Sequence, residues 1–285
     1  MTQKDSLPKI IILDTTMRDG ELTPGVKMTL QDKLKLAKHL EAMQVDVIEV
    51  GCPGIFPKDF DEIIAVSGMV RESIICGLAG SKQDEISCLA QALKPAARSR
   101  IHLYTPVNHQ DQSEMDEQEL LEVIGDSVSL ARNYCADIEW SAFDAPRSKP
   151  DFLCKAVEVA IKSGVTTISI PDTFGSLVPE QFSGLIEMVS NRVPNIEQAT
   201  ISVHCHNDLG LAVDNSLAAL ACGARQIECS INGLGARKGN ADLVEVVTAI
   251  ANHQDYRVDV EPTLLPQASE LVAEITDTQL IPNPG

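Results

Sequence analysis

The sequence has few aromatic residues, a shortage of positive charge and no long apolar run. Aromatic residues make up 4% of the 285 residues although 44% are hydrophobic, so a core must be built mainly from aliphatic side chains. Such side chains fill the interiors of α/β barrels. Lysine and arginine number 23 against 41 acidic residues, giving a formal net charge of −18. This balance argues against nucleic acid or an anionic membrane as a partner. An anionic substrate must therefore be bound by local basic residues.

Features of secreted and membrane proteins are also missing. Residues 1–6 contain no apolar signal-peptide segment, and no hydrophobic run has the length of a membrane span. The eight cysteines form no C-x-x-C pair, and most of them sit inside apolar runs. Reduced cysteines of this kind behave as small hydrophobic residues in a reducing cytosol. The sequence therefore predicts a cytoplasmic protein.

Eight short apolar runs, typical of buried strands, recur along the chain. They cover residues 9–14, 45–51, 74–79, 100–105, 137–141, 166–171, 201–206 and 226–231. Most are separated by one amphipathic helical segment, such as residues 29–43 with Thr29 as the expected N-cap. Eight such alternations predict a (β/α)₈ TIM barrel in a single domain, 1–285. A doubly wound open sheet is the alternative, but no G-x-G-x-x-G motif follows the first run.

In a TIM barrel the chemistry lies at the C-terminal ends of the strands. The residues expected there include Arg18, Asp19, Glu49, His102, Asp144, Asp172, Thr173, His204, His206 and the segment 232–240. A strand would project His204 and His206 to the same side, because they lie two residues apart. Two imidazoles and an acid from elsewhere suit a divalent metal. A lone H-x-H pair is more often structural, and it is the convergence of several polar residues on one rim that favours the metal.

Three segments resemble the signatures of the α-isopropylmalate synthase/homocitrate synthase family. They are residues 14–21 (Asp-Thr-Thr-Met-Arg-Asp-Gly-Glu), 204–210 (His-Cys-His-Asn-Asp-Leu-Gly) and 232–240 (Asn-Gly-Leu-Gly-Ala-Arg-Lys-Gly-Asn). They occur in the family's order, and residues 48–51 and 170–175 also match. The family belongs to the metal-dependent barrels that include hydroxymethylglutaryl-CoA lyase. Within it, this chain looks closest to the isopropylmalate synthase branch.

The resemblance implies a divalent metal, either Mn, Mg, Co or Zn, bound by Asp19, His204, His206 and Asn240. One carboxylate, two neutral imidazoles and an amide leave net positive charge on such an ion. Two open positions can then accept the carboxylate and ketone oxygens of an α-keto acid. The resemblance therefore implies both the metal and the class of ligand that it binds.

The same resemblance implies roles for other residues on the rim. Arg18 is expected to polarise the ketone and to stabilise the alkoxide formed from it. Thr173 is expected to donate a hydrogen bond to the substrate carboxylate, and His102 to line the pocket. Asp14 and Glu49 are expected to support the Arg18–Asp19 loop from behind, although a role in a turn or cap is equally open for both.

The implied reaction condenses acetyl-CoA with an α-keto acid, 2-ketoisovalerate first among them, to a 2-alkylmalate such as 2-isopropylmalate in leucine biosynthesis. Gly233, Gly235 and Gly239 would let the backbone approach a bound ligand or the metal, although a glycine-rich loop alone is a weak signal. Family resemblance also implies a homodimer that acts on small molecules.

Several departures from the family pattern keep other functions open. Phe143 stands where the family usually has a glutamate that takes part in proton transfer, Leu22 where it has glutamine, and Ala236 where it has glutamate. The helical subdomain that carries a catalytic histidine, and the regulatory domain, are expected to be absent. The chain is then either a shortened form or a compact relative whose base comes from elsewhere. The alternatives are a homocitrate or citramalate synthase, a carbon–carbon lyase or aldolase of the same superfamily, and a catalytically silent metal-binding barrel.

Overall fold

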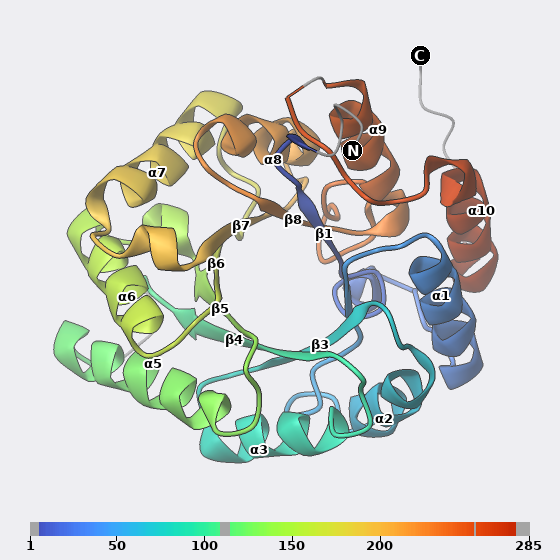
Figure 1. Cartoon of the computed structure of the whole chain (residues 1–285), viewed down its shortest axis with the longest axis horizontal. Coiled ribbons are helices and arrows are strands. Elements are labelled where there is room, and N and C mark those ends of the chain that lie inside the picture. The colour runs from blue at the N-terminus through green and yellow to red at the C-terminus, as the bar shows by residue number, and fades with distance from the viewer. Residues whose placement is uncertain (1–5, 109–114, 254, 278–285) are drawn as a thin grey trace.

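The computed structural model describes residues 6–108, 115–253 and 255–277, which form a closed barrel of parallel strands surrounded by helices (Figure 1). The strands are β1 (Ile11–Asp14), β2 (Val47–Glu49), β3 (Ile74–Ala79), β4 (Ser99–Pro106), β5 (Ile138–Phe143), β6 (Thr167–Asp172), β7 (Thr200–Cys205) and β8 (Gln226–Cys229). They pair in chain order, and β1 pairs with β8 to close the barrel. The predicted TIM barrel is confirmed, and the open sheet is excluded. The predictions about the chain ends rest on residues 1–6 and 281–285, which lie outside the described residues except for Ser6.

Helices follow the strands and form the outer layer (Figure 1). They are α1 (Leu30–Ala42), α2 (Asp59–Met69), α3 (Gln83–Ala92), α5 (Glu117–Arg132), α6 (Pro150–Lys162), α7 (Pro179–Arg192), α8 (Ala212–Ala221), α9 (Leu243–Asn252) and α10 (Leu265–Thr276). Thr29 caps α1 as predicted: its hydroxyl accepts from the Asp32 N–H at 3.2 Å, and the Asp32 carboxylate accepts from the Thr29 N–H at 2.9 Å. This reciprocal pair satisfies two backbone donors that a helix start leaves free. Among the described residues, no helix has both the length and the apolar character needed to span a membrane.

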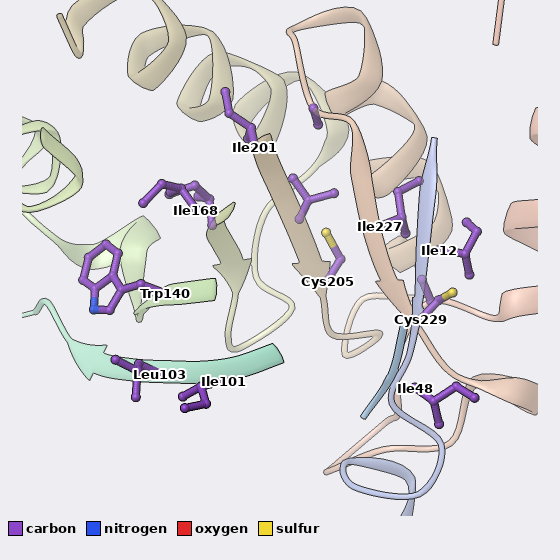
Figure 2. Close-up of a cluster of buried hydrophobic side chains, with 14 of the residues drawn as sticks. Ile12, Ile48, Ile101, Leu103, Trp140, Ile168, Ile201, Cys205, Ile227 and Cys229 are labelled. Carbon is purple, nitrogen blue, oxygen red and sulfur yellow. The ribbon is translucent and has the colours of Figure 1, made fainter. Parts of the chain in front are cut away.

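The hydrophobic core lies between the strands and the helices. Figure 2 shows buried side chains contributed by most of the strands, including Ile12, Ile48, Ile101, Leu103, Trp140, Ile168, Ile201, Cys205, Ile227 and Cys229. Trp140 is fully buried, and its indole N–H donates to the Thr105 hydroxyl at 3.0 Å. The core is thus aliphatic, as the composition predicts, and its one indole has the hydrogen-bond partner that a buried Trp requires.

The inside of the barrel is divided into an apolar part and a polar part. The apolar part is a small separate cluster of Ile11, Leu13, Val47, Ile74 and Cys76. In the polar part, Arg100 donates to Glu139 at 2.9 Å and to Gln226 at 2.7 Å, and Gln226 donates to Glu139 at 2.7 Å. These mutual hydrogen bonds compensate for the burial of polar groups below the rim.

Lys33 is a fully buried lysine on α1, and its removal is expected to destabilise the fold. Its ammonium lies 2.9 Å from Glu21 and 2.7 Å from Glu62. Lys33→Met would leave two largely buried carboxylates without this partner, so we expect the free energy of unfolding to fall by about 3 kcal/mol. Chemical denaturation measures the change. Lys35→Met, on the same helix and 58% exposed, is the control and should change stability by no more than about 0.5 kcal/mol. Equal stabilities of the two variants would contradict the argument.

Candidate metal centre and substrate pocket

A cavity of about 470 Å³ opens at the C-terminal ends of the strands. Its lining residues are Arg18, Asp19, Ile55, Leu78, His102, Tyr104, Pro106, Ser141, Phe143, Pro171, Thr173, His204, His206 and Glu228. The structure therefore brings Arg18, Asp19, His102, Thr173 and both histidines into one pocket, although they are far apart in the sequence. Asp14 and Glu49 are buried and do not line this pocket.

Asp19, His204 and His206 form a cluster in which one potential ligand atom from each lies within 4.8 Å of the others. Asp19 follows β1 and His204 lies on β7, with the two imidazole rings 4.9 Å apart between centroids. The prediction that both histidines lie on the strand is wrong for His206, which follows β7 and forms an isolated bridge with Asn240. This bridge joins the loop after β8 to the end of β7, so Asn240 reaches the same place.

Hydrogen bonds orient both imidazoles. The Nδ1 atom of His204 is 2.9 Å from the buried Glu228 carboxylate, and the Nδ1 atom of His206 is 3.2 Å from the Gly239 carbonyl oxygen. Each contact holds one ring nitrogen and leaves Nε2 as the atom available to a ligand. Outer partners of this kind fix the tautomer and the orientation of metal-binding histidines.

Asn240 completes a donor set that fits a divalent metal ion. Its Nδ2 group donates to the Leu234 carbonyl at 2.9 Å and lies 3.3 Å from Asp19 Oδ1. Its Oδ1 atom is buried and has no hydrogen-bond partner among the described residues. A buried acceptor without a partner is costly, and a cation is the kind of group that would satisfy it. Carboxylate, amide and imidazole donors together match Mn, Mg, Co or Zn.

The electrostatics of Asp19 and His206 suit a cation, whereas burial would lower the pKa of His204 but Glu228 and Asp19 raise it. Burial would raise the pKa of Asp19, but the Arg18 guanidinium and the two imidazoles lower that pKa to about 2. Burial and the neighbouring His204 lower the pKa of His206 to about 4. At neutral pH Asp19 is therefore an anion and His206 is a neutral imidazole, which are the protonation states that metal ligands require.

Arg18 is held at the pocket wall by two carboxylates. Its Nε group donates to Glu49 at 2.6 Å, and its Nη1 group donates to Asp19. Glu49 also accepts from the Thr15 hydroxyl at 2.7 Å and lies 2.8 Å from Nδ1 of His102. Burial opposes ionisation of Glu49, but Arg18 and His102 lower its pKa below the usual range. Burial would lower the pKa of His102, but Glu139 and Glu49 raise it to about 9. Glu49 is therefore the anion that positions both cations.

Thr173 follows β6 with its hydroxyl oriented by the neighbouring loop. The hydroxyl oxygen accepts from the Asp144 N–H at 2.9 Å, so its own hydrogen remains available for a ligand. The acids predicted at the same strand ends have structural partners. Asp144 pairs with Arg147 at 2.6 Å, and Asp172 accepts from the backbone N–H groups of residues 176–177. These acids shape loops of the rim, whereas Thr173 lines the pocket.

Asp14 connects two loops through hydrogen bonds that its carboxylate accepts from Thr16. Its carboxylate accepts from the Thr16 hydroxyl at 2.6 Å and from the Thr16 N–H at 3.1 Å. The Thr16 hydroxyl in turn accepts from the Ile231 N–H at 2.8 Å. Complete burial raises the pKa of Asp14 to about 7. Asp14 therefore supports the loop after β1 by tying it to the loop after β8.

The three glycines of the loop after β8 are required by close contacts within the protein. A Cβ atom on Gly239 would lie 2.0 Å from the Gly233 carbonyl oxygen, and both residues have positive φ angles, +93° and +62°. A Cβ atom on Gly235 would lie 2.4 Å from Asn240 Nδ2 and 3.0 Å from Asp19 Oδ1. Only glycine permits such approach at these positions. The loop thus packs directly on two of the candidate metal ligands.

Gly235→Ala is expected to weaken metal binding by displacing Asn240 and Asp19. Because supporting contacts of metal ligands typically contribute 10- to 100-fold to affinity, we expect a loss of about tenfold or more. Titration of the protein with Mn²⁺ measures it. The matched control is Gly184→Ala on α7, where a Cβ atom meets nothing within 4 Å. That variant should keep full metal affinity and gain about 0.5 kcal/mol of stability; a Gly235→Ala protein with unchanged affinity would contradict the packing argument.

Glu228, Tyr104 and Leu78 are site residues that the sequence reasoning missed. Glu228 is buried on β8 and holds His204, and Tyr104 and Leu78 line the pocket from β4 and β3. One signal for Glu228 was present. It is an acid in a short strand, two residues after the polar Gln226 and therefore on the same inward side. No comparable signal marks Tyr104 or Leu78, because aromatic and aliphatic residues are ordinary in strands.

Comparisons with known proteins show the family and the fold of this chain. The HMGL-like family model matches residues 9–272. Curated 2-isopropylmalate synthases of Rhodopseudomonas palustris (strain HaA2) and Methylococcus capsulatus are 46% and 45% identical over 281 residues, which is 96% of this chain and 54% and 55% of those proteins. The chain thus spans about half the length of the curated relatives it matches. Two solved structures share the fold. Hydroxymethylglutaryl-CoA lyase from Pseudomonas aeruginosa is 21% identical, with a TM-score of 0.78 and 96% of each chain covered. HMG-CoA lyase from Brucella melitensis is 20% identical, with a TM-score of 0.77 and coverage of 94% of this chain and 99% of that one.

Proposed function

Because this chain belongs to the HMGL-like family, we propose that it is an acyltransferase that condenses acetyl-CoA with an α-keto acid. The preferred keto acid is 2-ketoisovalerate and the product is 2-isopropylmalate. The observation that carries the proposal is the convergence of Asp19, His204 and His206 beside Arg18 and Thr173 in one cavity, with Asn240 bridged to His206. The identity of about 46% to curated 2-isopropylmalate synthases supports the choice of reaction.

The proposed reaction forms one carbon–carbon bond and breaks one thioester. The methyl group of acetyl-CoA loses a proton, and the resulting enolate attacks the keto carbon, whose oxygen becomes an alkoxide and then a hydroxyl. Water hydrolyses the thioester, releasing CoA and a 2-hydroxy diacid. The largest electrostatic demand arises where the alkoxide forms, so positive charge is needed at the ketone oxygen.

The chain supplies the groups that bind and orient the keto acid. Asp19, His204, His206 and Asn240 would hold a divalent ion, which would supply Lewis-acid polarisation of the ketone. Arg18, held by Glu49, contributes positive charge beside the ketone oxygen. Thr173 donates its hydroxyl hydrogen to the substrate carboxylate, and the His102 imidazolium lines the pocket wall.

The remaining features of the proposal are the identity of the metal ion, the oligomeric state and the location in the cell. Mn²⁺, Mg²⁺, Co²⁺ and Zn²⁺ are all candidate ions for mixed nitrogen and oxygen ligands. A homodimer and a cytoplasmic location complete the proposal, and the second is supported by eight cysteines that are all free thiols. Dimerisation is testable by sedimentation of the purified protein.

The decisive experiment measures CoA release with a thiol reagent. The protein is incubated with acetyl-CoA, one metal and one keto acid, using 2-ketoisovalerate, 2-ketoglutarate or pyruvate. We expect release with 2-ketoisovalerate, loss of that release on chelation and recovery on adding metal back. Release with 2-ketoglutarate or pyruvate alone would instead indicate homocitrate or citramalate synthesis, and no release with any acid and any of the four metals would refute the proposal.

A further inference from the structure

Aromatic side chains are scarce in this chain, yet three of them form a row at the pocket. The sequence contains 6 Phe, 3 Tyr and 1 Trp in 285 residues. The ring centroid of Phe143 lies 6.2 Å from that of Tyr104 and 6.5 Å from that of Phe174. Tyr104 and Phe143 line the cavity, and Phe174 stands outside the lining, half-exposed at the rim. Pair distances of 4.5–7 Å are those of favourable aromatic contacts, so the row has a defined geometry.

The cavity has a polar arc and an apolar arc that face each other across the barrel. The metal-ligand candidates come from β7 and from the loops after β1 and β8. Leu78, Tyr104, Pro106 and Phe143 come from β3, β4 and β5, which also contribute the polar lining residues His102 and Ser141. Since the strands are arranged in chain order around a closed barrel, β3–β5 lie opposite the β7–β8–β1 arc (Figure 1).

The cations near the aromatic row are already engaged. His102, two residues before Tyr104 on β4, has its Nδ1 atom 2.8 Å from the Glu49 carboxylate. The guanidinium carbon of Arg147 lies 4.6 Å from the Phe174 ring centroid, and that of Arg237 lies 5.6 Å from it. Arg147 pairs with Asp144, and Arg237 pairs with Asp208 at 3.0 Å. These arginines stack on the rim ring, and neither is among the residues that line the cavity beside Phe143.

We propose that Phe143 determines the keto-acid class by packing against the substituent on the keto carbon, so that this chain selects apolar substituents and rejects a second carboxylate. The inference rests on the proposed function. With the carboxylate and ketone oxygens of the substrate bound by the polar arc, the substituent extends toward the apolar arc. An aliphatic group gains contact there, whereas a carboxylate loses its hydration against an aromatic ring, and the nearby cations His102, Arg147 and Arg237 are already paired with carboxylates. The unfavourable contact with a carboxylate is as important to selectivity as the favourable contact with an aliphatic group.

Calorimetric titration of the Mn²⁺-loaded protein tests this directly. The ligands are pyruvate, 2-ketoisovalerate and 2-ketoglutarate, titrated into the wild-type protein, Phe143→Ala and Phe143→Lys. We expect Phe143→Ala to bind 2-ketoisovalerate roughly tenfold more weakly, with little change for pyruvate, whose methyl group is too short to reach the ring. Phe143→Lys should gain affinity for 2-ketoglutarate, because it places a cation on the apolar arc.

The controls separate this inference from the proposed function. Phe56→Ala removes an exposed phenylalanine that does not line the cavity, and it should leave all three affinities unchanged. Thermal unfolding checks each variant, and Phe143→Leu replaces any variant that fails to fold, with a smaller loss of 2-ketoisovalerate affinity expected. If the wild-type protein binds keto acids but the Phe143 variants keep its order of affinities, the inference is overturned while the proposed function stands. If the wild-type protein binds none of the acids, both are overturned.

Discussion

Replacing His204 by alanine is expected to abolish high-affinity binding of a divalent metal and, with it, metal-dependent CoA release. His204 is almost fully buried, and its Nδ1 atom is held by Glu228, so its Nε2 atom is fixed toward Asp19 and His206. Loss of a contact that merely supports a metal ligand typically costs 10- to 100-fold in affinity. Loss of the ligand itself should cost more than about 100-fold.

Metal titration by calorimetry measures this effect without reference to catalysis. His253→Ala is the matched control, since that histidine is largely exposed after α9 and contacts only the nearby surface residues Asp255 and Tyr256 through its ring among the described residues. It should retain full affinity. Glu228→Gln is a graded variant that keeps the ligand but weakens its orientation, and we expect an intermediate loss. Undiminished metal binding by the His204→Ala protein would show that the ion binds elsewhere.

The barrel was predictable because its signals are local and repeated. Each strand is a short apolar run and each intervening helix carries its own periodic pattern, so a misjudged boundary does not disturb the count. The observed strand bounds lie within two residues of the predicted ones. The differences lie at the strand ends, as at His206, which pairs with Asn240 beyond β7. A strand's end depends on its partners, and those are not visible in its own residues.

The meeting of Asp19, His204 and His206 was predictable for a different reason. A TIM barrel gathers the ends of all its strands on one face, so topology alone converts residues nearly 200 positions apart into neighbours. Contacts inside the barrel do not follow in the same way. That Glu49 binds both Arg18 and His102, or that Glu228 binds His204, depends on register and rotamers across several strands. The sequence contains the residues but no measure of those distances.

Replacing Arg18 by lysine is expected to lower kcat for CoA release by about 100-fold or more while leaving metal affinity largely intact. Arg18 bridges Glu49 through Nε and Asp19 through Nη1. A lysine keeps the charge but lacks the planar fork that reaches both carboxylates at once. The charge would then no longer be fixed beside the developing alkoxide, and removal of one such donor costs about 10²–10³ in kcat.

The kinetic pattern distinguishes this role from simple substrate binding. Since the alkoxide exists only along the reaction, loss of its stabilisation should lower kcat and kcat/KM together, with little change in KM. Arg71→Lys, at an exposed position after α2, is the control and should preserve both constants. A higher KM with kcat unchanged in Arg18→Lys would assign the guanidinium to binding the ground-state carboxylate. In the Arg18→Lys variant Glu49 keeps its contact with His102, and Asp19 keeps its place beside His204 and His206, so we expect the variant to stay folded. A loss of kcat then reports a change in the chemistry at the ketone oxygen.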